Sequence, residues 1–144
     1  MINQKIYIGT DSLIFSNTTG KLQIVLVTRK NDPYAGHRAF PGGFLEEEEE
    51  LEAGALRELQ EETGIKLPAV TQLGAFGGVH RDPRFRTITV AHYAIVDANE
   101  HTPQGGDDAA DAQWVNVEDI DQLAFDHSEI LAYALAHLAD QLKA

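Results

Sequence analysis

The sequence contains no cysteine, which excludes disulfide bonds, thiolate catalysis and zinc sites built on cysteine. It also lacks any apolar run of the roughly 18 or more residues that a membrane-spanning helix requires. The N-terminal segment from Met1 to Lys5 has neither the basic start nor the apolar stretch of a secretory signal. We therefore expect a cytoplasmic protein that does not associate with a membrane.

Basic residues are also scarce. Eleven lysines and arginines stand against 23 aspartates and glutamates, which gives a formal net charge of -12. General nucleic-acid binding needs a basic surface that displaces counterions from phosphates, so we expect no nucleic-acid partner. A small phosphorylated molecule remains compatible with this charge, because a metal ion or a few arginines can reverse the local sign. Three of the basic residues are concentrated in one short segment: Arg81, Arg84 and Arg86.

The length and composition are those of one domain, which we expect to span residues 1–144 around a single core. Two β-branched, apolar segments at 5–15 and 21–30 flank a turn and predict a hairpin. Further strands are expected at 71–79, 86–96 and 113–117, with a polar loop over 99–111.

Two segments have helical patterns. Residues 50–63 are mostly good helix formers, and Gly64 stands where a C-terminal cap belongs. Apolar residues recur at helical spacing between 127 and 142, which predicts an amphipathic helix. Strands and helices alternate with hairpins among them, so the expected fold class is α/β, with a mixed sheet covered by helices on both faces.

Three glutamates of the first predicted helix are spaced i, i+3 and i+4: Glu58, Glu61 and Glu62. At about 100° per residue they share one face. The ordinary interpretation of such a run is a solvated surface. However, Glu62 lies angularly between Leu51 and Ala55 of the apolar stripe, so the carboxylates point along the margin of the core. Clustered carboxylates there need a neutralising cation, and hard oxygen ligands suit Mg²⁺ or Mn²⁺.

The same region carries a spaced motif. Gly43, Glu49 and the run Arg57-Glu58-Leu59-Gln60-Glu61-Glu62-Thr63-Gly64-Ile65 resemble the Nudix box at every defining position. The resemblance implies an α/β/α sandwich in which the box forms a loop–helix–loop. It also implies metal-dependent hydrolysis of the diphosphate of a nucleoside diphosphate linked to another moiety. In that chemistry the bound cations activate a water and stabilise the charge that develops during the reaction.

The resemblance assigns roles within the box. The residues expected to hold the metal are four carboxylates and one backbone carbonyl: Glu58, Glu61, Glu62, Glu49 and Gly42. Arg57 is expected to orient a metal-binding glutamate, and we group it with the three helix glutamates as catalytic. The base that takes the proton of the attacking water stays open between Glu58 and a loop residue outside the box.

Four further segments resemble ADP-ribose pyrophosphatases: residues 30–34, 40–44, 81–86 and 123–131. We therefore expect ADP-ribose to be cleaved to AMP and ribose 5-phosphate. Guanidinium groups match phosphate oxygens, so Arg81, Arg84 and Arg86 are expected to bind the substrate. At most two of the three can point the same way if a strand begins at Phe85.

Two alternatives are kept. The enzyme can act on another substrate, such as a dinucleotide, a nucleotide sugar or an oxidised nucleoside triphosphate. The chain can also be a non-catalytic ADP-ribose sensor, because related transcriptional regulators share these segments. Those regulators usually carry a degenerate box and an added DNA-binding winged helix. Here the box is intact and the sequence ends about one helix after residue 127, so we favour the enzyme, and we expect a homodimer by analogy with the pyrophosphatases.

Some residues keep several interpretations at this point. His127 can be a base, a residue that starts a helix or a packed core imidazole. Phe40 and Tyr34 are better candidates to contact the adenine than Trp114 and Tyr133, which we expect in the core.

Overall fold

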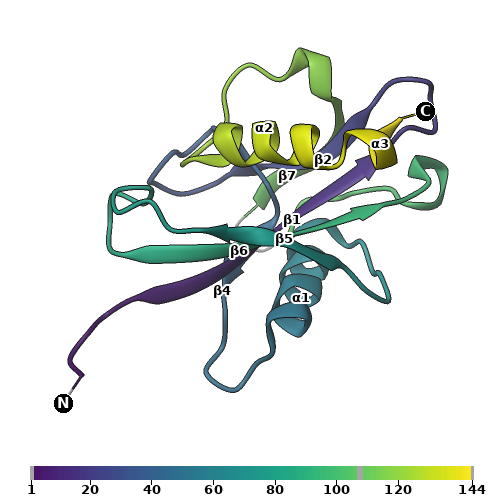
Figure 1. The fold of residues 1–144 in the computed structure, drawn as a ribbon. Coiled ribbons are helices and arrows are strands. Elements are labelled where there is room, and N and C mark those ends of the chain that lie inside the picture. Colours follow the sequence, from purple (N-terminus) through teal and green to yellow (C-terminus); the bar gives the residue numbers. More distant parts are fainter. Residues whose placement is uncertain (1, 107–108, 144) are drawn as a thin grey trace.

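The computed structural model describes residues 2–106 and 109–143 (Figure 1). The strands of this part of the chain are β1 (Tyr7–Ser16), β2 (Gln23–Arg29), β3 (Arg38–Ala39), β4 (Gly42–Phe44), β5 (Thr71–Phe76), β6 (Thr87–Ile95) and β7 (Ala109–Asn116). The helices are α1 (Leu51–Thr63), α2 (His127–His137) and α3 (Ala139–Leu142), with short 3₁₀ turns at Ala98–Glu100 and Val117–Asp119. None of the helices in the described ranges is long and apolar enough to cross a membrane.

The strands form one mixed sheet in the order β3-β2-β1-β6-β5, with β4 paired to β1 and β7 paired to β2. β1 and β6 run parallel from the Tyr7–Thr87 pair to the Phe15–Ile95 pair, whereas the other pairings are antiparallel. The central strand β1 pairs with β2 only through Phe15 and Ser16. Towards its N-terminal end the partner of β1 is β4, so β1 and β2 diverge there.

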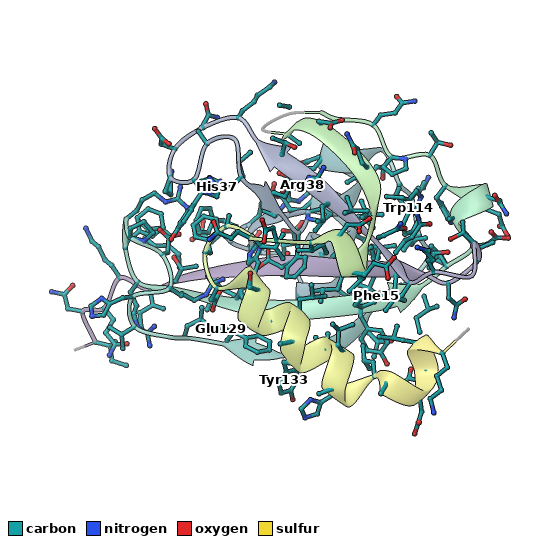
Figure 2. All side chains as sticks on the ribbon, turned by 90° about the horizontal axis from the view of Figure 1, so that it is seen from above. Phe15, His37, Arg38, Trp114, Glu129 and Tyr133 are labelled. Atoms are coloured by element: carbon teal, nitrogen blue, oxygen red, sulfur yellow. The ribbon has the colours of Figure 1, made fainter. Side chains whose placement is uncertain are left out.

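Helices cover both faces of the sheet, with α1 on one side and α2 and α3 on the other (Figure 1). The alternation of side chains along β1 divides the core accordingly. Leu13 and Phe15 pack into a cluster with residues of α2, whereas Ile14 packs with Ala55 and Leu59 of α1. Figure 2 looks onto the α2 face, with Phe15 among the side chains near the helix. The expected α/β class and α/β/α layering are therefore confirmed.

Most expected elements are present, with shifted ends. Gly64 caps α1 in the left-handed conformation at φ 75°, as its position predicts. The expected C-terminal helix is divided at Leu138 into α2 and α3. β7 begins at Ala109 and not near 113, so the expected loop over 99–111 is shorter, and residues 107–108 of it lie outside the described part. The longer strand forms because Ala109 still pairs with Arg29 of β2 across a register shift.

Candidate functional site

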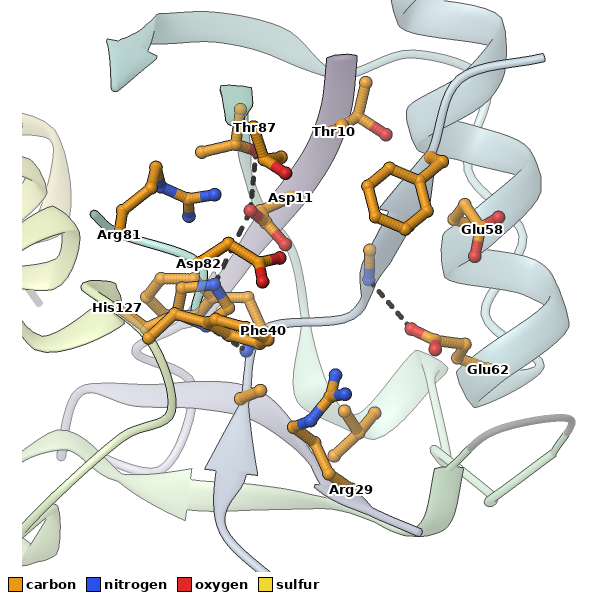
Figure 3. A pocket seen from close by; sticks show the side chains of 18 of the residues that line it. Thr10, Asp11, Arg29, Phe40, Glu58, Glu62, Arg81, Asp82, Thr87 and His127 are labelled. Carbon is orange, nitrogen blue, oxygen red and sulfur yellow. Dashed lines mark hydrogen bonds and ion pairs between the residues drawn. The ribbon is translucent and has the colours of Figure 1, made fainter. Parts of the chain in front are cut away.

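A cavity of about 390 Å³ opens where β1 and β2 diverge (Figure 3). Its walls come from β1, the end of β2, the segment from Ala39 to Glu46, α1, the 81–89 segment and the beginning of α2. Acidic and basic side chains both line it. The acidic ones are Asp11, Asp32, Glu46, Glu58, Glu62 and Asp82, and the basic ones are Arg29, Arg57, Arg81 and Arg84. The cavity is large enough for a nucleotide-sized ligand.

The α1 wall brings two of the predicted carboxylates to the first residues of β4. Glu62 is 9% exposed, and its Oε1 accepts a hydrogen bond of 2.8 Å from the Gly42 backbone N–H. The Glu58 carboxylate lies directly over Gly43, where a Cβ would meet its Oε2 at 2.6 Å. Gly43 therefore has to lack a side chain for Glu58 to enter the pocket, which gives this box glycine a steric role.

Arg57 ties the glutamates of the box together. Its Nε and Nη2 donate to the two oxygens of Glu49 at 2.7 and 2.9 Å. Its Nη1 donates to Glu58 at 2.8 Å and to Glu61 Oε2 at 3.2 Å. These hydrogen bonds, first of all those to Glu49, raise the pKa of Arg57. The guanidinium thus holds three carboxylates in one arrangement, and the orienting role expected for it stays a prediction.

The ionisation of the two half-buried carboxyls differs. The hydrogen bond from Arg57 lowers the pKa of Glu49, and burial is the smaller opposing effect. For Glu58, burial is the largest effect and raises its pKa above the ordinary value, although Arg57 opposes the shift. A cation near Glu58 would therefore favour the ionised form of this carboxyl.

Only some of the predicted metal ligands lie together in the pocket. Glu58, Glu62 and Gly42 line the pocket, whereas Glu49 and Glu61 bind Arg57 beside it. Over residues 2–106 and 109–143, no three His, Asp or Glu side chains are grouped closely enough to hold an ion as they stand. The donor chemistry still fits Mg²⁺ or Mn²⁺, because the space above Gly43 admits hard carboxylate and carbonyl oxygens.

The predicted arginines separate into two groups. Arg81 and Arg84 line the pocket, and each forms a two-pronged ion pair: Arg81 with Asp126 at 3.0 and 2.7 Å, and Arg84 with Asp82 at 3.1 and 2.9 Å. Arg86 instead donates to the carbonyls of Gly77 and Gly78 at 2.7 and 3.2 Å. Two of the three arginines thus point into the pocket, which is the most that the strand geometry allowed.

Asp11 is a pocket residue that sequence reasoning missed. It lies in β1, and its Oδ2 accepts a hydrogen bond of 2.6 Å from Thr89 of β6. Burial raises the pKa of Asp11, but the interactions with His127, the Thr89 hydroxyl and the Arg81 charge outweigh it, so the pKa lies below its usual value. The available signal was the one acidic residue in the mostly apolar predicted strand 5–15.

The aromatic residues differ from expectation. Phe40 lines the pocket but is 2% exposed and stacks on His127. Tyr34 and Phe125, both in the left-handed region at φ 63° and 53°, contact each other at 4.9 Å between ring centroids. Phe125 lines the pocket, with the Arg29 guanidinium over its ring at 4.8 Å; it lies in the 123–131 segment that resembles ADP-ribose pyrophosphatases, but no role was predicted for it.

Trp114 packs partly buried against the α1 cluster, with its Nε1 donating to the His101 carbonyl, in agreement with the core position expected for it. Tyr133 is 37% exposed and stacks on His137, on the outer side of α2 (Figure 2), so its expected core position is wrong. Its ring meets Phe76 of the edge strand β5 at 5.3 Å between centroids and not the core, because Ile130, Leu131 and Ala134 occupy the inward positions of the helix.

Known proteins share the fold and the motif of this chain. Residues 8–137 match the model of the NUDIX domain. The chain is 37% identical over 137 residues to the ADPR responsive transcriptional repressor NtrR of Acinetobacter baylyi, which covers 92% of this chain. It is 38% identical over 109 residues to the ADP-ribose pyrophosphatase of Methanocaldococcus jannaschii, which covers 76% of this chain. The chain spans only 54% and 63% of the lengths of these two relatives.

Solved structures of Nudix proteins have the same fold as this chain. A MutT/nudix family protein from Enterococcus faecalis superposes with a TM-score of 0.89 at 30% identity, over 97% of this chain and 64% of that one. The NUDIX domain of Shewanella oneidensis NrtR, solved in complex with ADP ribose, superposes with a TM-score of 0.88 at 30% identity, over 94% of this chain and 90% of that one.

Proposed function

The chain belongs to the Nudix family, and on that premise we propose that it hydrolyses the diphosphate of ADP-ribose to AMP and ribose 5-phosphate with Mg²⁺ or Mn²⁺. The observation that carries the proposal is the composition of the pocket, in which Glu58 and Glu62 share one cavity with Arg81 and Arg84 (Figure 3). Carboxylates on one side suit metal ions, and guanidinium groups on the other suit phosphate oxygens. The pyrophosphatase relative from M. jannaschii supports the choice of substrate.

We assign metal binding to the carboxylates Glu58, Glu61, Glu62 and Glu49 and to the Gly42 carbonyl. When bound, the ions would polarise the diphosphate and lower the pKa of the attacking water. Arg57 keeps the glutamates close together before the ions bind. Glu61 is the ligand with most freedom to turn, because 42% of its side chain is exposed and its ion pair with Arg57 is correspondingly weak.

We assign substrate binding to Arg81 and Arg84. The Arg81 side chain is 5% exposed, and Asp126 fixes its orientation, so its guanidinium is preorganised. Arg84 is more exposed at 36% and lies over the rings of Phe85 and Phe44 at 4.9 and 5.7 Å. This arrangement offers a charge beside aromatic faces, which suits a phosphate next to a base or sugar. Arg86 is not included, because its guanidinium is committed to backbone carbonyls outside the pocket.

A panel of substrates tests the proposal. ADP-ribose, dinucleotides, nucleotide sugars and oxidised nucleoside triphosphates are assayed with Mg²⁺ and with Mn²⁺. Glu62→Gln is expected to lower kcat about 100-fold or more while the protein stays folded, because it removes a charge and little volume. The matched control is Glu47→Gln in the exposed glutamate run, which is expected to keep full activity. Equal turnover by Glu62→Gln and the unmodified protein would refute the catalytic assignment, and a panel without preference for ADP-ribose would refute the substrate.

A second candidate is an ADP-ribose sensor. It is favoured by the similarity to the NtrR repressor over 92% of the chain. The sensor predicts ADP-ribose binding by calorimetry without turnover. The complete box and the arrangement of its glutamates around Arg57 favour hydrolysis.

The absence of a nucleic-acid partner and the homodimer remain predictions. The net charge of -12 supports the first, and a mobility-shift assay with duplex DNA tests it. Light scattering tests the second, and a mass near 15.8 kDa would reject the dimer.

A further inference from the structure

His127, the first residue of α2, is buried with both ring nitrogens engaged. Its Nδ1 accepts a hydrogen bond of 3.1 Å from the backbone N–H of Phe40. An acceptor nitrogen carries a lone pair, so the ring proton sits on Nε2. That Nε2 faces Asp11 Oδ2 at 3.5 Å, and the ring stacks on Phe40 at 4.5 Å with an interplanar angle of 15° (Figure 3).

This geometry decides among the interpretations of His127. A general base needs a free lone pair that reaches the proton it removes. The lone pair of His127 is occupied by the Phe40 N–H, and its side chain is 3% exposed. His127 is therefore not placed to take a proton from water in the pocket.

The backbone that His127 contacts belongs to residues 40–43, a loop that runs into the start of β4 and carries Gly42 and the box glycine Gly43. Phe40 begins the turn from β3 to β4, and the Pro41 carbonyl accepts a hydrogen bond of 2.9 Å from the Ser12 N–H. The next residue, Gly42, lies so close to Asp11 that an added Cβ would collide with its carboxylate and with the Thr10 carbonyl. His127 and Asp11 thus contact the loop from one side.

Glu58 and Glu62 contact the same loop from the other side. Glu62 binds the Gly42 N–H, and the Glu58 carboxylate lies against Gly43. The position of residues 40–43 therefore depends on α2 as well as on α1, and a shift on the His127 side moves the backbone that meets both glutamates. The α2 contact lies 87 residues from the loop in the sequence and outside the box.

We propose that His127 is a positioning residue that sets the Phe40–Gly43 loop against Glu58 and Glu62 and thereby sets the affinity of the site for divalent metal. The inference rests on the proposed function, because it assumes that these glutamates bind the ion. The decisive contact is the Phe40 N–H to Nδ1 bond, since it fixes the loop backbone directly. The Asp11 contact keeps the imidazole in the tautomer that can accept this bond.

Two substitutions separate the two contacts. In His127→Asn the amide oxygen can occupy the place of Nδ1 and accept from Phe40, but the side chain no longer reaches Asp11. In His127→Gln the amide nitrogen can occupy the place of Nε2 and face Asp11, but the Phe40 N–H loses its acceptor. We expect His127→Gln to weaken Mn²⁺ binding and to lower kcat about 10- to 100-fold, and His127→Asn to recover most of that loss. KM for ADP-ribose is expected to change less than kcat.

Mn²⁺ affinity is measured without substrate, from the electron paramagnetic resonance signal of the free ion, on the full chain. Circular dichroism and Tm check the fold of each variant. The matched control is His137→Gln, an exposed position at the other end of α2, which is expected to leave Mn²⁺ affinity and kcat unchanged. Equal Mn²⁺ affinities of the Asn and Gln variants, whether both normal or both reduced, would overturn the role of the Phe40 bond.

Asp11→Asn provides the second measurement if His127→Gln does not fold. It removes the carboxylate that faces His127 and borders Gly42, and it is expected to weaken Mn²⁺ binding about 10-fold. Unchanged Mn²⁺ affinity in this variant would also overturn the proposal. The two proposals fail differently. A protein that binds Mn²⁺ but hydrolyses nothing in the panel refutes the proposed function, and the Mn²⁺ affinities of the variants can still be compared. Normal hydrolysis by all His127 and Asp11 variants refutes only the positioning role.

Discussion

Gly42 and Glu62 are joined by a hydrogen bond of 2.8 Å from the Gly42 N–H to Glu62 Oε1. This bond connects the first residue of β4, just before the box begins, to the last turn of α1 near the end of the box. Because Glu62 is 9% exposed, its carboxylate is held in the pocket wall and does not move freely in solvent. The more solvent-exposed part of the box is the Arg57 side, where 42% of the Glu61 side chain is exposed.

Gly43→Ala is expected to fold and to lose activity. The new Cβ would lie 2.6 Å from the Glu58 carboxylate, which is the flexible end of a side chain and can move away. The displaced Glu58 would then fail to meet a metal ion, and we expect kcat to fall about 100-fold with a small change in Tm. Gly78→Ala is the control, since its new Cβ would make only an ordinary contact with the Arg81 side chain at 3.8 Å. Full activity of Gly43→Ala would show that Glu58 is not needed at this position.

Arg57→Lys keeps the positive charge but loses the planar fork. An ammonium group cannot reach both oxygens of Glu49 while also contacting Glu58 and Glu61 as the guanidinium does. We expect kcat to fall about 10- to 100-fold, with KM changed less. Lys21→Gln, which breaks an exposed ion pair with Glu118, controls for the loss of a surface charge contact and is expected to have no effect. A normal kcat for Arg57→Lys would contradict the orienting role.

The box could be predicted from the sequence because its information is local. Glu58 and Glu62 follow from helical spacing within one element, and the cap at Gly64 follows from one residue type at one position. The contacts of Asp11 and His127 do not follow from any local pattern. A strand residue and a helix-start residue meet only because the sheet order brings β1 under the beginning of α2, and that order is fixed by packing of the whole domain.

The arginine segment illustrates the same limit on a smaller scale. The spacing allowed at most two arginines on one side but did not say which two. The choice depends on which carboxylate each arginine meets: Asp82 of the same segment binds Arg84, whereas Arg81 binds Asp126, which is 45 residues away in the sequence. Arg86 instead caps the carbonyls that follow β5, a contact that the edge of the sheet creates.

Arg84→Gln is expected to raise KM for ADP-ribose about 10-fold or more, because a charged hydrogen bond to phosphate is lost. Asp82 loses its partner in this variant, so a fall in Tm is expected as well; Arg84 holds the pKa of that buried carboxyl below its usual value, although burial itself raises it. Arg86→Gln serves as the comparison, because the Arg86 guanidinium donates to the Gly77 and Gly78 carbonyls and does not line the pocket; it is expected to change KM less than about 3-fold. The assay is steady-state kinetics at saturating Mg²⁺. If Arg86→Gln had the larger effect on KM, the assignment of the two arginines would be reversed.

His92 in β6 makes the stability of the fold depend on pH. It is fully buried, its Nδ1 lies 3.0 Å from the Val90 carbonyl, and its Nε2 has no hydrogen-bond partner among the described residues. Burial lowers the pKa of His92 below its model-compound value of 6.5. The folded state therefore favours the neutral ring, so this contribution to stability is complete above pH 6.5 and is lost as the pH falls through the lower pKa of the folded state.

Urea denaturation between pH 5 and pH 8 measures the effect on the free energy of unfolding. His92→Gln cannot titrate, so its free energy of unfolding is expected to fall less on acidification than that of the unmodified protein, whatever its stability at pH 8. His80→Gln is the control, because His80 is exposed and is expected to leave the pH dependence unchanged. Parallel curves for the unmodified protein and His92→Gln would mean that the acid sensitivity arises elsewhere, since removing a buried base must remove its share of the proton uptake on unfolding.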